Sequence, residues 1–517
     1  MRESVLFKKV LVANRGEIAV RILRACREMG IDSVAVYSDA DGEALHVRCA
    51  DESCCIGPGP VSESYLNVAR VVEAAKACGA EAIHPGYGFL SERADFARAC
   101  ADAGIAFIGP PPDAMSRLGD KVQARRIARE AGVPTVPGTE GTVAPEEAKA
   151  IAGSIGYPVL IKAAAGGGGR GIRVVPDESA LESSVRVAAT EAEGAFGDPS
   201  LYVEKYLDPV RHIEIQILAD KHGNVVHLGE RECSVQRRNQ KLIEESPSTA
   251  VTPELRARMG AAAVAIARHA GYENAGTVEF LVDDEDNFYF IEVNARLQVE
   301  HPVTEMVTGI DLVREQLRIA AGEPLSFNQK DVQFRGWAIE CRITAEDPLQ
   351  NFMPGLGSVD FVSEPSGPGI RVDSSLFAGL VIPEFYDSML SKVIAWGADR
   401  EEAIRRLKRA LGEYAILGPK TTIPFHLQLL DNPDFRAGDI YTRFLEQKFT
   451  MSAAGDPAAE DLALAVAAAL SHQKRSNGAR ANGAAPGERP QASGWKAAGR
   501  ISAVSRNAGG GLWRSTF

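Results

Sequence analysis

The chain has 517 residues, of which 45% are hydrophobic and 24% are charged, and its formal net charge is −12 at pH 7. A globular protein of this size can bury several hydrophobic cores. The acidic balance opposes binding to nucleic acids and to anionic membranes. No apolar run approaches the length of a membrane span, and the eight cysteines show no metal-site spacing, so we expect a reduced, cytoplasmic protein.

The N-terminal part alternates strand-like and helical segments. Residues 9–13 and 33–37 have strand length and strand composition, and the segment between them places Ile18, Ile22 and Cys26 on one helical face. This alternation predicts a doubly wound, mostly parallel α/β unit. The first turn lacks the G-x-G-x-x-G pattern, so a nicotinamide site is not expected there.

A helical pattern over 120–131 stops at Gly132 and leads into a compact α+β segment over about 133–206. Within this segment, a β-rich run passes through Lys162 into four consecutive glycines, Gly166–Gly169, and a second β-rich run follows. Glycines let the backbone approach a phosphate, and a lysine at the end of an apolar strand needs an anionic partner. A P-loop would open a helix instead. We therefore favour a hairpin lid over nucleotide phosphates, with a plain flexible hairpin tip as the alternative.

Residues 290–301 alternate apolar and polar side chains, which is the period of a strand with one face on a core. The polar side chains are Glu292, Asn294, Arg296, Gln298 and Glu300. Oxygen ligands beside a cation suit a hard metal ion next to an anion. Alone, the pattern is more typical of a solvated strand face. The acidic stretch 283–287 just before it lacks calcium-loop spacing and predicts a hairpin turn.

The C-terminal end has a different composition. Residues 456–475 are rich in alanine and place Leu462, Val466 and Leu470 at helical spacing, while residues 476–517 are rich in Ala, Gly, Ser and Arg. We expect a helix that docks onto a partner subunit, with a flexible leftover as the alternative, followed by a largely disordered tail.

Several motifs, in one order along the chain, resemble a known family. Lys162 before the glycines, the run 204–207 and the set Glu279, Glu292 and Asn294 resemble an ATP-grasp enzyme. Longer motifs look like biotin carboxylase in particular: NRGEIA at 14–19, HPGYGFLSE at 84–92, GDK at 119–121, CSVQRRNQK at 233–241, EHPVTE at 300–305 and ECRI at 340–343. The resemblance covers roughly residues 5 to 448.

The resemblance implies an α/β and α+β protein with an ATP-grasp fold, an N-terminal doubly wound (pre-ATP-grasp) domain, a mobile glycine-hairpin lid and a C-terminal biotin carboxylase domain. The expected boundaries are 1–118 for the N-terminal, Rossmann-like domain, 119–330 for the ATP-grasp domain with its lid at about 133–206, 331–448 for the C-terminal domain and 449–517 for the tail. The tail has no Met-Lys-Met sequence, so a fused carrier domain is not expected.

The reaction implied by the resemblance converts ATP, bicarbonate and carrier-bound biotin into carboxybiotin, ADP and phosphate through carboxyphosphate. The implied cofactors are ATP and Mg²⁺ or Mn²⁺, with biotin supplied on a separate carrier protein. This would be the first half-reaction of an acetyl-CoA or propionyl-CoA carboxylase, as in fatty acid biosynthesis. The expected partners are a biotin carboxyl carrier protein, carboxyltransferase subunits and a second copy of the chain, with no nucleic acid and no membrane.

The resemblance also assigns the nucleotide and metal site. Glu279, Glu292 and Asn294 would bind the metal. Lys121 and Lys162 would bind phosphates under the glycine backbone. The implied ATP contacts are Lys121, Lys162, Gly166, Gly167, Gly168, Gly169, Glu204, Lys205, Tyr206, Leu207, His212, Gln236, Asn239, Glu279 and Glu292. Among them, the backbones of Lys205 and Leu207 would bind the adenine edge.

The resemblance also assigns the residues that would bind bicarbonate and biotin. The bicarbonate pocket would be formed by Lys241, Arg296, Gln298, Val299 (through its backbone) and Glu300. Glu300 would be the general base that deprotonates bicarbonate. Arg342 would stabilise the enolate-like ureido oxygen of biotin, and Tyr87 would line the approach of biotin. The implied catalytic residues are Arg296, Glu300, Arg342 and Lys241, whereas His84 is expected to stabilise a turn.

One departure from the family and several alternatives stay open. Asn239 stands where the family often has histidine; it can hydrogen-bond a ribose hydroxyl but cannot carry a charge, so this contact is in doubt. The alternatives are another ATP-grasp ligase, a component of a pyruvate carboxylase and a non-catalytic ATP-binding protein. The sequence does not decide the acyl acceptor, the partner subunits, the oligomeric state or the role of residues 449–517.

Overall fold

The structure is a computed structural model that describes residues 6–139, 141, 143–144, 147–163, 172–196 and 199–452. Its contacts divide the chain into Met1–Met451 and Ser452–Phe517. The predicted glycine hairpin Gly166–Gly169, the predicted helix within 456–475 and the tail 476–517 lie outside the described residues.

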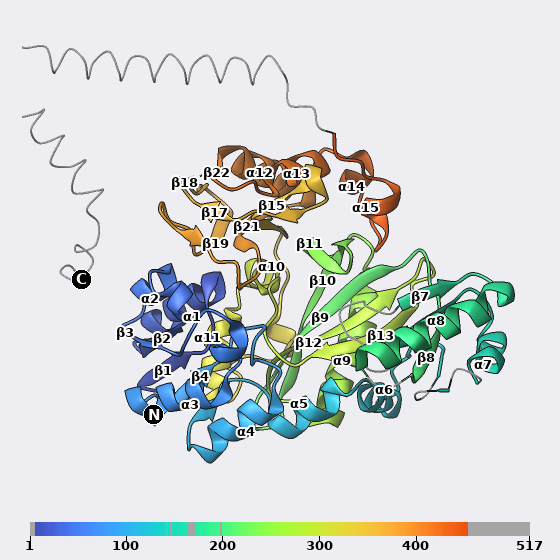
Figure 1. Ribbon diagram of the computed structural model, residues 1–517, viewed down its shortest axis with the longest axis horizontal. Helices are drawn as coiled ribbons and strands as arrows, with labels where there is room; N and C mark the ends of the chain where they lie inside the picture. Colours follow the sequence, from blue (N-terminus) through green and yellow to red (C-terminus); the bar gives the residue numbers. More distant parts are fainter. Residues whose placement is uncertain are drawn as a thin grey trace, which may run out of the picture. The chain divides into compact units, whose positions relative to one another are not determined.

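The N-terminal part is a parallel five-stranded sheet between helices (Figure 1), with the strand order β3-β2-β1-β4-β5. Its strands are β1 (Lys9–Val12), β2 (Asp32–Tyr37), β3 (Glu52–Cys55), β4 (Ala82–His84) and β5 (Ala106–Phe107). Its helices are α1 (Gly16–Glu28), α2 (Leu45–Cys49), α3 (Val68–Cys78) and α4 (Ala94–Asp102). Val10 and Val12 enter one hydrophobic cluster and Leu11 another, so both faces of the sheet are covered. The predicted doubly wound unit is confirmed.

An eight-stranded antiparallel sheet follows, with the order β13-β12-β9-β10-β11-β14-β21-β19. Its strands are β9 (Arg211–Ala219), β10 (Val225–Arg237), β11 (Gln240–Ser246), β12 (Asn274–Val282), β13 (Phe288–Asn294), β14 (Trp337–Thr344), β19 (Ile370–Ser374) and β21 (Met389–Gly397). The sheet continues across the domain boundary predicted at 330/331, since β14, β19 and β21 extend it. The domain boundaries themselves stay a prediction.

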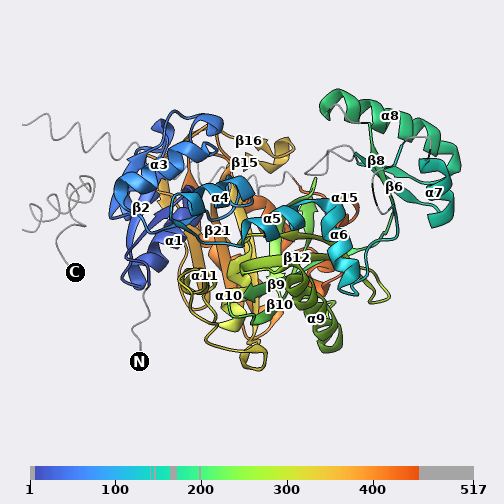
Figure 2. The ribbon, with the colours of Figure 1, turned by 90° about the horizontal axis from the view of Figure 1, so that it is seen from below.

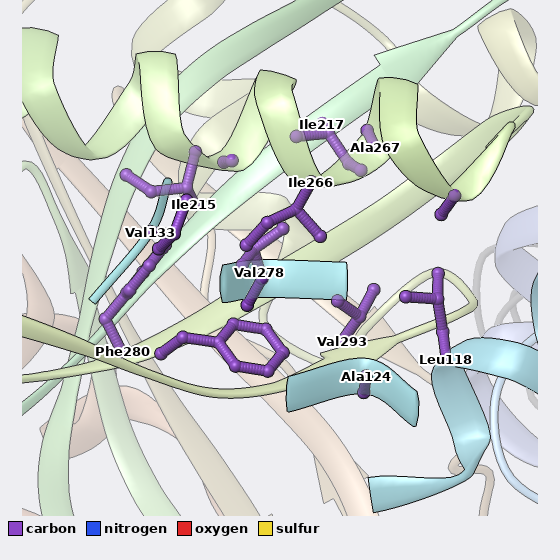
Figure 3. Close-up of a cluster of buried hydrophobic side chains, with 14 of the residues drawn as sticks. Leu118, Ala124, Val133, Ile215, Ile217, Ile266, Ala267, Val278, Phe280 and Val293 are labelled. Atoms are coloured by element: carbon purple, nitrogen blue, oxygen red, sulfur yellow. The ribbon is translucent and has the colours of Figure 1, made fainter. Parts of the chain in front are cut away.

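One face of this sheet packs on a hydrophobic core beneath α9 (Pro253–Ala270), α5 (Pro112–Gly119) and α6 (Lys121–Glu130). Figure 3 shows Val278, Phe280 and Val293 together with Ile266 of α9 and Leu118 of α5. Because side chains alternate along a strand, the residues between these core positions lie on the opposite face. That opposite face carries the candidate site.

A smaller sheet, β7-β6-β8, holds the segment around the glycines. It consists of β6 (Val159–Ala163), β7 (Ile172–Val175) and β8 (Leu201–Lys205), covered by α7 (Ala148–Ile155) and α8 (Glu178–Phe196), as Figure 2 shows. β6 and β7 pair antiparallel, with Lys162 opposite Ile172. The arrangement agrees with a strand–glycine–strand hairpin.

The remaining elements follow β13 in the chain, and α11 among them packs on β12 and the N-terminal part. The helices are α10 (His301–Thr308), α11 (Leu312–Ala320), α12 (Arg400–Glu413), α13 (Ile423–Leu429), α14 (Pro433–Ala437) and α15 (Phe444–Gln447). The short strands are β15 (Glu346–Asp347), β16 (Met353–Pro354), β17 (Gly357–Ser358), β18 (Phe361–Ser363), β20 (Val381–Ile382) and β22 (Ala415–Leu417). Among the described residues, no helix combines the length and the apolar character needed to cross a membrane.

Candidate active site

Charged side chains form a row across four adjacent strands, on the face opposite the core. The paired positions on β13, β12, β9 and β10 are Glu292, Glu279, Glu214 and Arg231. Cross-strand neighbours on one face lie about 5 Å apart at their Cβ atoms. Three carboxylates are therefore gathered beside one guanidinium.

Lys241, on β11, brings the predicted bicarbonate and metal residues together. Its Nζ donates to Glu214 at 2.6 Å, to Glu279 at 2.9 Å and to Glu300 at 2.7 Å. Burial alone would lower the pKa of Lys241, but the three carboxylates raise it well above its ordinary value. Lys241 is therefore a charged ammonium at the centre of the site.

Glu300, the predicted base, lies at the start of α10 between two cations. One carboxylate oxygen accepts from Lys241, and the other accepts from Nη2 of Arg342 at 2.9 Å. Burial favours the neutral acid, yet Lys241 and Arg342 hold the pKa of Glu300 well below its usual range. Arg342, on β14, is held in turn by Glu244, whose Oε1 accepts from its Nε at 2.6 Å. The residues predicted for bicarbonate and for biotin thus meet at one ionised carboxylate.

Arg296 is held by a residue from the N-terminal part. Its Nε donates to Glu92 at 3.1 Å, and its Nη2 donates to Oδ1 of Asn294 at 2.9 Å. The other oxygen of Glu92 accepts from the backbone N–H of Ala295 at 3.0 Å. Glu92 therefore positions both the guanidinium and the start of the loop 295–300.

Gln298 and Val299 are held by two further buried cations. Gln298 donates from Nε2 to Glu279 at 2.8 Å and accepts from Arg231 at 2.8 Å. The carbonyl oxygen of Val299 accepts from Nζ of Lys392 at 2.6 Å. The loop that carries the predicted bicarbonate residues is thus supported from β10 and from β21.

The predicted metal ligands are adjacent, and their donor set fits a hard divalent cation. Glu279 and Glu292 are opposite each other on paired strands, and Asn294 donates from Nδ2 to Glu279 at 2.8 Å. Burial and the Glu279 carboxylate raise the pKa of Glu292. A cation between the two carboxylates would remove this repulsion, and all-oxygen sets suit Mg²⁺.

A second group could also offer metal ligands. Among the described residues, ligand atoms of His212, Glu214 and Glu279 lie within 4.8 Å of one another. Glu214, however, is already bound by Arg231 and by Lys241. The set with Glu292 is therefore the better candidate.

The predicted phosphate lysines are placed on β6 and α6. Lys162 forms an ion pair with Glu204, which also pairs with Arg125. Although burial opposes ionisation, these two cations lower the pKa of Glu204. Lys121 is the first residue of α6 and is exposed. The Glu204 carboxylate thus holds Lys162 here, a contact that the sequence analysis did not predict.

The residues predicted around the adenine follow β8. Lys205 donates from Nζ to the backbone carbonyls of Gly156 at 3.0 Å and Tyr157 at 2.9 Å. Tyr206 and Leu207 come directly after the strand and are partly buried. The Lys205 side chain therefore anchors the end of β8 to the backbone at 156–157.

The remaining predicted nucleotide contacts lie on β9, β10 and the turn that follows. Nε2 of His212 lies 3.0 Å from the Glu279 carboxylate, and its Nδ1 accepts from Gln236 at 3.0 Å. Asn239 is exposed at the tip of the β10–β11 hairpin, where Arg238 and Asn239 have φ angles of 50° and 64°. Asparagine tolerates this left-handed conformation better than most residues.

His84 is the last residue of β4, and Tyr87 belongs to the loop that follows. The hydroxyl of Tyr87 donates to the buried Glu17, while Nδ1 of His84 accepts from the N–H of Gly86 at 3.1 Å. Burial lowers the pKa of His84 to about 3, so this imidazole is neutral. His84 has the expected turn role.

Five contact residues were missed by the sequence analysis: Glu92, Glu214, Arg231, Glu244 and Lys392. Glu92 lies inside a motif that was recognised. A lysine inside an apolar strand requires a partner, and this rule, applied to Lys162, could also have selected Lys392. Nothing local distinguished the others from ordinary strand residues.

A cavity of about 370 Å³ is lined by different residues, among them Arg21, Glu305 and Arg371. Two of its cations are already paired: Arg21 lies 3.0 Å from Glu305, and Arg371 lies 2.6 Å from Glu305. This cavity contains none of the predicted site residues.

Family models match three consecutive segments of the chain. Residues 6–115 match the "Biotin carboxylase, N-terminal domain". Residues 120–328 match the "Carbamoyl-phosphate synthase L chain, ATP binding domain". Residues 340–447 match the "Biotin carboxylase C-terminal domain".

Similar proteins serve more than one carboxylase. Biotin carboxylase 1 of Bacillus subtilis is 56% identical over 85% of this chain and 98% of its own length. The small subunit of the 2-oxoglutarate carboxylase of Hydrogenobacter thermophilus is 52% identical over 86% of this chain and 94% of its own length. A crystal structure shows the biotin carboxylase domain dimer of that same carboxylase with MgADP, ADP and bicarbonate. This structure has a TM-score of 0.82 to the present one and 52% sequence identity, and the match covers 86% of this chain and 98% of that chain. A pyruvate carboxylase component of Methanothermobacter thermautotrophicus is 56% identical over 86% of this chain and 90% of its own length.

Proposed function

Because the chain belongs to the biotin carboxylase family, we propose that the side chains around Glu300 are the active site of its reaction. The protein is an ATP-dependent enzyme that carboxylates biotin held on a carrier, and it uses ATP, Mg²⁺ and bicarbonate. One observation supports the location of the site above all others: Glu300 lies between Lys241 and Arg342.

Glu300 is the proposed base for bicarbonate. Its two ion pairs keep it ionised, and therefore able to accept a proton, but they also weaken its basicity. Substrate binding must loosen at least one of these pairs before the proton moves. Lys241 is the better candidate to be drawn away, since incoming phosphate and bicarbonate oxygens would compete for its ammonium.

Bicarbonate is proposed to bind beside Glu300, at Arg296, Gln298 and the Val299 backbone. Glu92 orients the Arg296 guanidinium, whose planar fork suits a carboxylate-like anion. Gln298 is fixed by Arg231 and Glu279, so its amide requires little reorganisation on binding.

Phosphates are proposed to bind at Lys121 and Lys162, with the glycine backbone of 166–169 over them. Glu279, Glu292 and Asn294 would hold the metal, which neutralises charge between the β- and γ-phosphates when bound. Lys162 must leave Glu204 at least partly to reach a phosphate, and Arg125 then remains as the partner of that carboxylate.

Biotin is proposed to bind at Arg342, on the far side of Glu300 from Lys241. The guanidinium would stabilise the charge that develops on the ureido oxygen, and Glu244 keeps it in place. Tyr87, whose hydroxyl is held by Glu17, would line the approach.

The carboxylase that this protein serves is proposed to be an acyl-CoA carboxylase, acting on acetyl-CoA or propionyl-CoA. The relative named Biotin carboxylase 1 is compatible with this acceptor, and the matches to components of pyruvate and 2-oxoglutarate carboxylases keep a different acceptor as the alternative. A separate carrier and carboxyltransferase would be its partners, and a dimer is proposed because a relative forms one. The cytoplasmic location stays a prediction.

The test is ADP release measured with and without bicarbonate and free biotin. We expect ADP formation to require bicarbonate and to rise when biotin is added. Binding of MgADP with no bicarbonate-dependent turnover would favour the non-catalytic alternative instead. Co-purification with tagged chain would then identify the carboxyltransferase and thus the acceptor.

A further inference from the structure

Lys392 is a fully buried ammonium that touches the backbone of the catalytic loop. Its side chain, on β21, has 0% exposure, and Nζ donates to the carbonyl oxygen of Val299 at 2.6 Å. A lysine is almost never fully buried unless a partner compensates its charge. Val299 directly precedes Glu300, so the contact is one residue from the proposed base.

The surroundings keep Lys392 charged. Nζ lies 3.4 Å from Glu17 on α1 and 3.9 Å from Asp373 on β19. Burial lowers the pKa of Lys392, but Glu17, Glu340 and Asp373 together raise it above its ordinary value, against the opposing charge of Arg371.

The carboxylates around Lys392 are not equivalent. Asp373 is already paired with Arg371 at 2.7 Å. Glu340 has no hydrogen-bond partner among the described residues, and burial raises its pKa well above the usual range. Glu17, at 3.4 Å, is the nearest carboxylate to the Lys392 ammonium, although burial raises its own pKa as well.

The contact holds a backbone group that no side chain of the loop holds. Because a peptide unit is planar, fixing the Val299 carbonyl also fixes the direction of the Glu300 N–H and the position of the Glu300 Cα. Arg231 supports the same loop at the Gln298 side chain. Lys392 supports it through the backbone from β21, three strands further along the sheet than β10, the strand of Arg231.

We propose that Lys392 is a positioning residue for the bicarbonate step: it holds the Val299–Glu300 peptide so that Glu300 and the bicarbonate loop are preorganised. The inference rests on the proposed function. The same ammonium contacts Glu17, which holds the Tyr87 hydroxyl, so one lysine ties the loop to the N-terminal part as well. Lys392 itself touches no substrate in this assignment.

The first test is Lys392→Met in bicarbonate-dependent ADP release without biotin. Misplacing a reacting group by about 1 Å costs on the order of 10²-fold in rate. We expect kcat/KM for bicarbonate to fall by roughly 10- to 100-fold, with a higher KM for bicarbonate. The KM for ATP should stay within about twofold, because Lys392 makes no contact with the ATP residues. Lys392→Arg, which keeps a donor, should recover part of the loss.

A second variant covers the case in which Lys392→Met leaves Glu17 unpaired and prevents folding. In the double variant E17Q/K392M the nearest buried charge is removed together with the lysine, while Val299 still lacks its donor. Measured against E17Q alone, the double variant should show the same selective loss toward bicarbonate. Circular dichroism and MgADP affinity report whether each variant is folded.

The matched control is Arg400→Met. Arg400 is also a largely buried cation with a carboxylate partner, Glu245, which accepts from its Nε at 2.7 Å, but it lies on α12 and makes no contact with the loop. This variant should lose stability without a selective change in the KM for bicarbonate. The inference would be overturned if the KM for bicarbonate were unchanged in both Lys392→Met and E17Q/K392M. It would also be overturned if these variants raised the KM for ATP as much as the KM for bicarbonate. Absence of bicarbonate-dependent turnover in the unmodified protein would instead contradict the proposed function.

Discussion

At the scale of single residues, the site is organised around the Glu300 carboxylate. Its two oxygens are bound by cations that the proposed mechanism uses in different steps, Lys241 for bicarbonate and Arg342 for biotin. A substitution at either cation therefore changes one substrate directly and Glu300 indirectly. The two half-reactions should respond unequally to such a change.

Arg342→Ala should lower carboxylation of free biotin by about 10²- to 10³-fold, because the charge on the ureido oxygen loses its stabilising donor. Bicarbonate-dependent ATP hydrolysis should fall by less than about tenfold, since Glu300 and the residues assigned to bicarbonate, including Lys241, are all still present. Parallel assays of ADP and of carboxybiotin check this difference. Equal losses in the two assays would contradict the division of roles.

At the scale of elements, two antiparallel hairpins determine where the polar residues lie. The β12–β13 hairpin sets Glu279 opposite Glu292, and the β10–β11 hairpin sets Gln236 opposite Lys241. A shift of one residue in either register would turn these side chains into the core. The tips of the hairpins therefore matter for the site as well as for the sheet.

Asn239→Val should destabilise the protein by about 1–2 kcal/mol, because a β-branched residue is strained at the φ of 64° found at this tip. Asn239→Gly should stay within about 0.5 kcal/mol of the unmodified protein, since glycine adopts this conformation freely. The urea unfolding midpoints of the two variants measure these changes in stability. If Asn239→Gly has the same KM for ATP as the unmodified protein, the predicted ribose contact of Asn239 contributes nothing to ATP binding. A raised KM for ATP would support that contact.

At the scale of the whole molecule, neutral buried histidines predict loss of stability in acid. His426, on α13, donates from Nε2 to the carbonyl of Arg342 at 2.8 Å, and burial lowers its pKa to about 4. Between pH 6.5 and about 4, the unfolded chain binds a proton at this position that the folded chain does not. The free energy of unfolding therefore falls as the pH drops through that range, by up to about 3 kcal/mol for this group.

Urea unfolding of His426→Asn at several pH values checks this expectation. The variant should be less stable at pH 7, yet its stability should depend less on pH between 6.5 and 4. His269→Asn is the control, because His269 is exposed on α9, and it should keep the pH dependence of the unmodified protein. An unaltered pH dependence in His426→Asn would show that the proton binds elsewhere.

The C-terminal end offers another test at this scale. Phe449 stacks edge-on against Phe425, with ring centroids 5.3 Å apart, and Met451 packs against the same core. A truncation should therefore end after Ser452 and not after Lys448. We expect the truncated chain to keep carboxylation of free biotin, because every predicted site residue precedes that point. Co-purification with a carboxyltransferase or carrier should weaken if the predicted helix within 456–475 docks there, and unchanged assembly would contradict that role.

Some of this protein could be predicted from the sequence alone. The alternation over 290–301 correctly placed Glu292 and Asn294 on the face opposite Val293, but the predicted strand ends at Asn294 and residues 295–300 form a loop instead. The β-rich run before the glycines marked Lys162 as a cation in need of a partner. The resemblance to biotin carboxylase supplied the fold class and a family that the comparisons confirm. These inferences depend on local periodicity and residue type, which a linear sequence displays directly.

Only the tertiary structure decided which charges meet. Lys241, Arg342 and Lys392 lie on three strands far apart in the chain, yet they reach Glu300 or the peptide before it. No periodicity within one segment encodes such pairings, since they depend on the strand order and register of the eight-stranded sheet. The physical reason is that burying a charge requires an opposite charge or a hydrogen-bond partner, and the fold supplies these from distant segments.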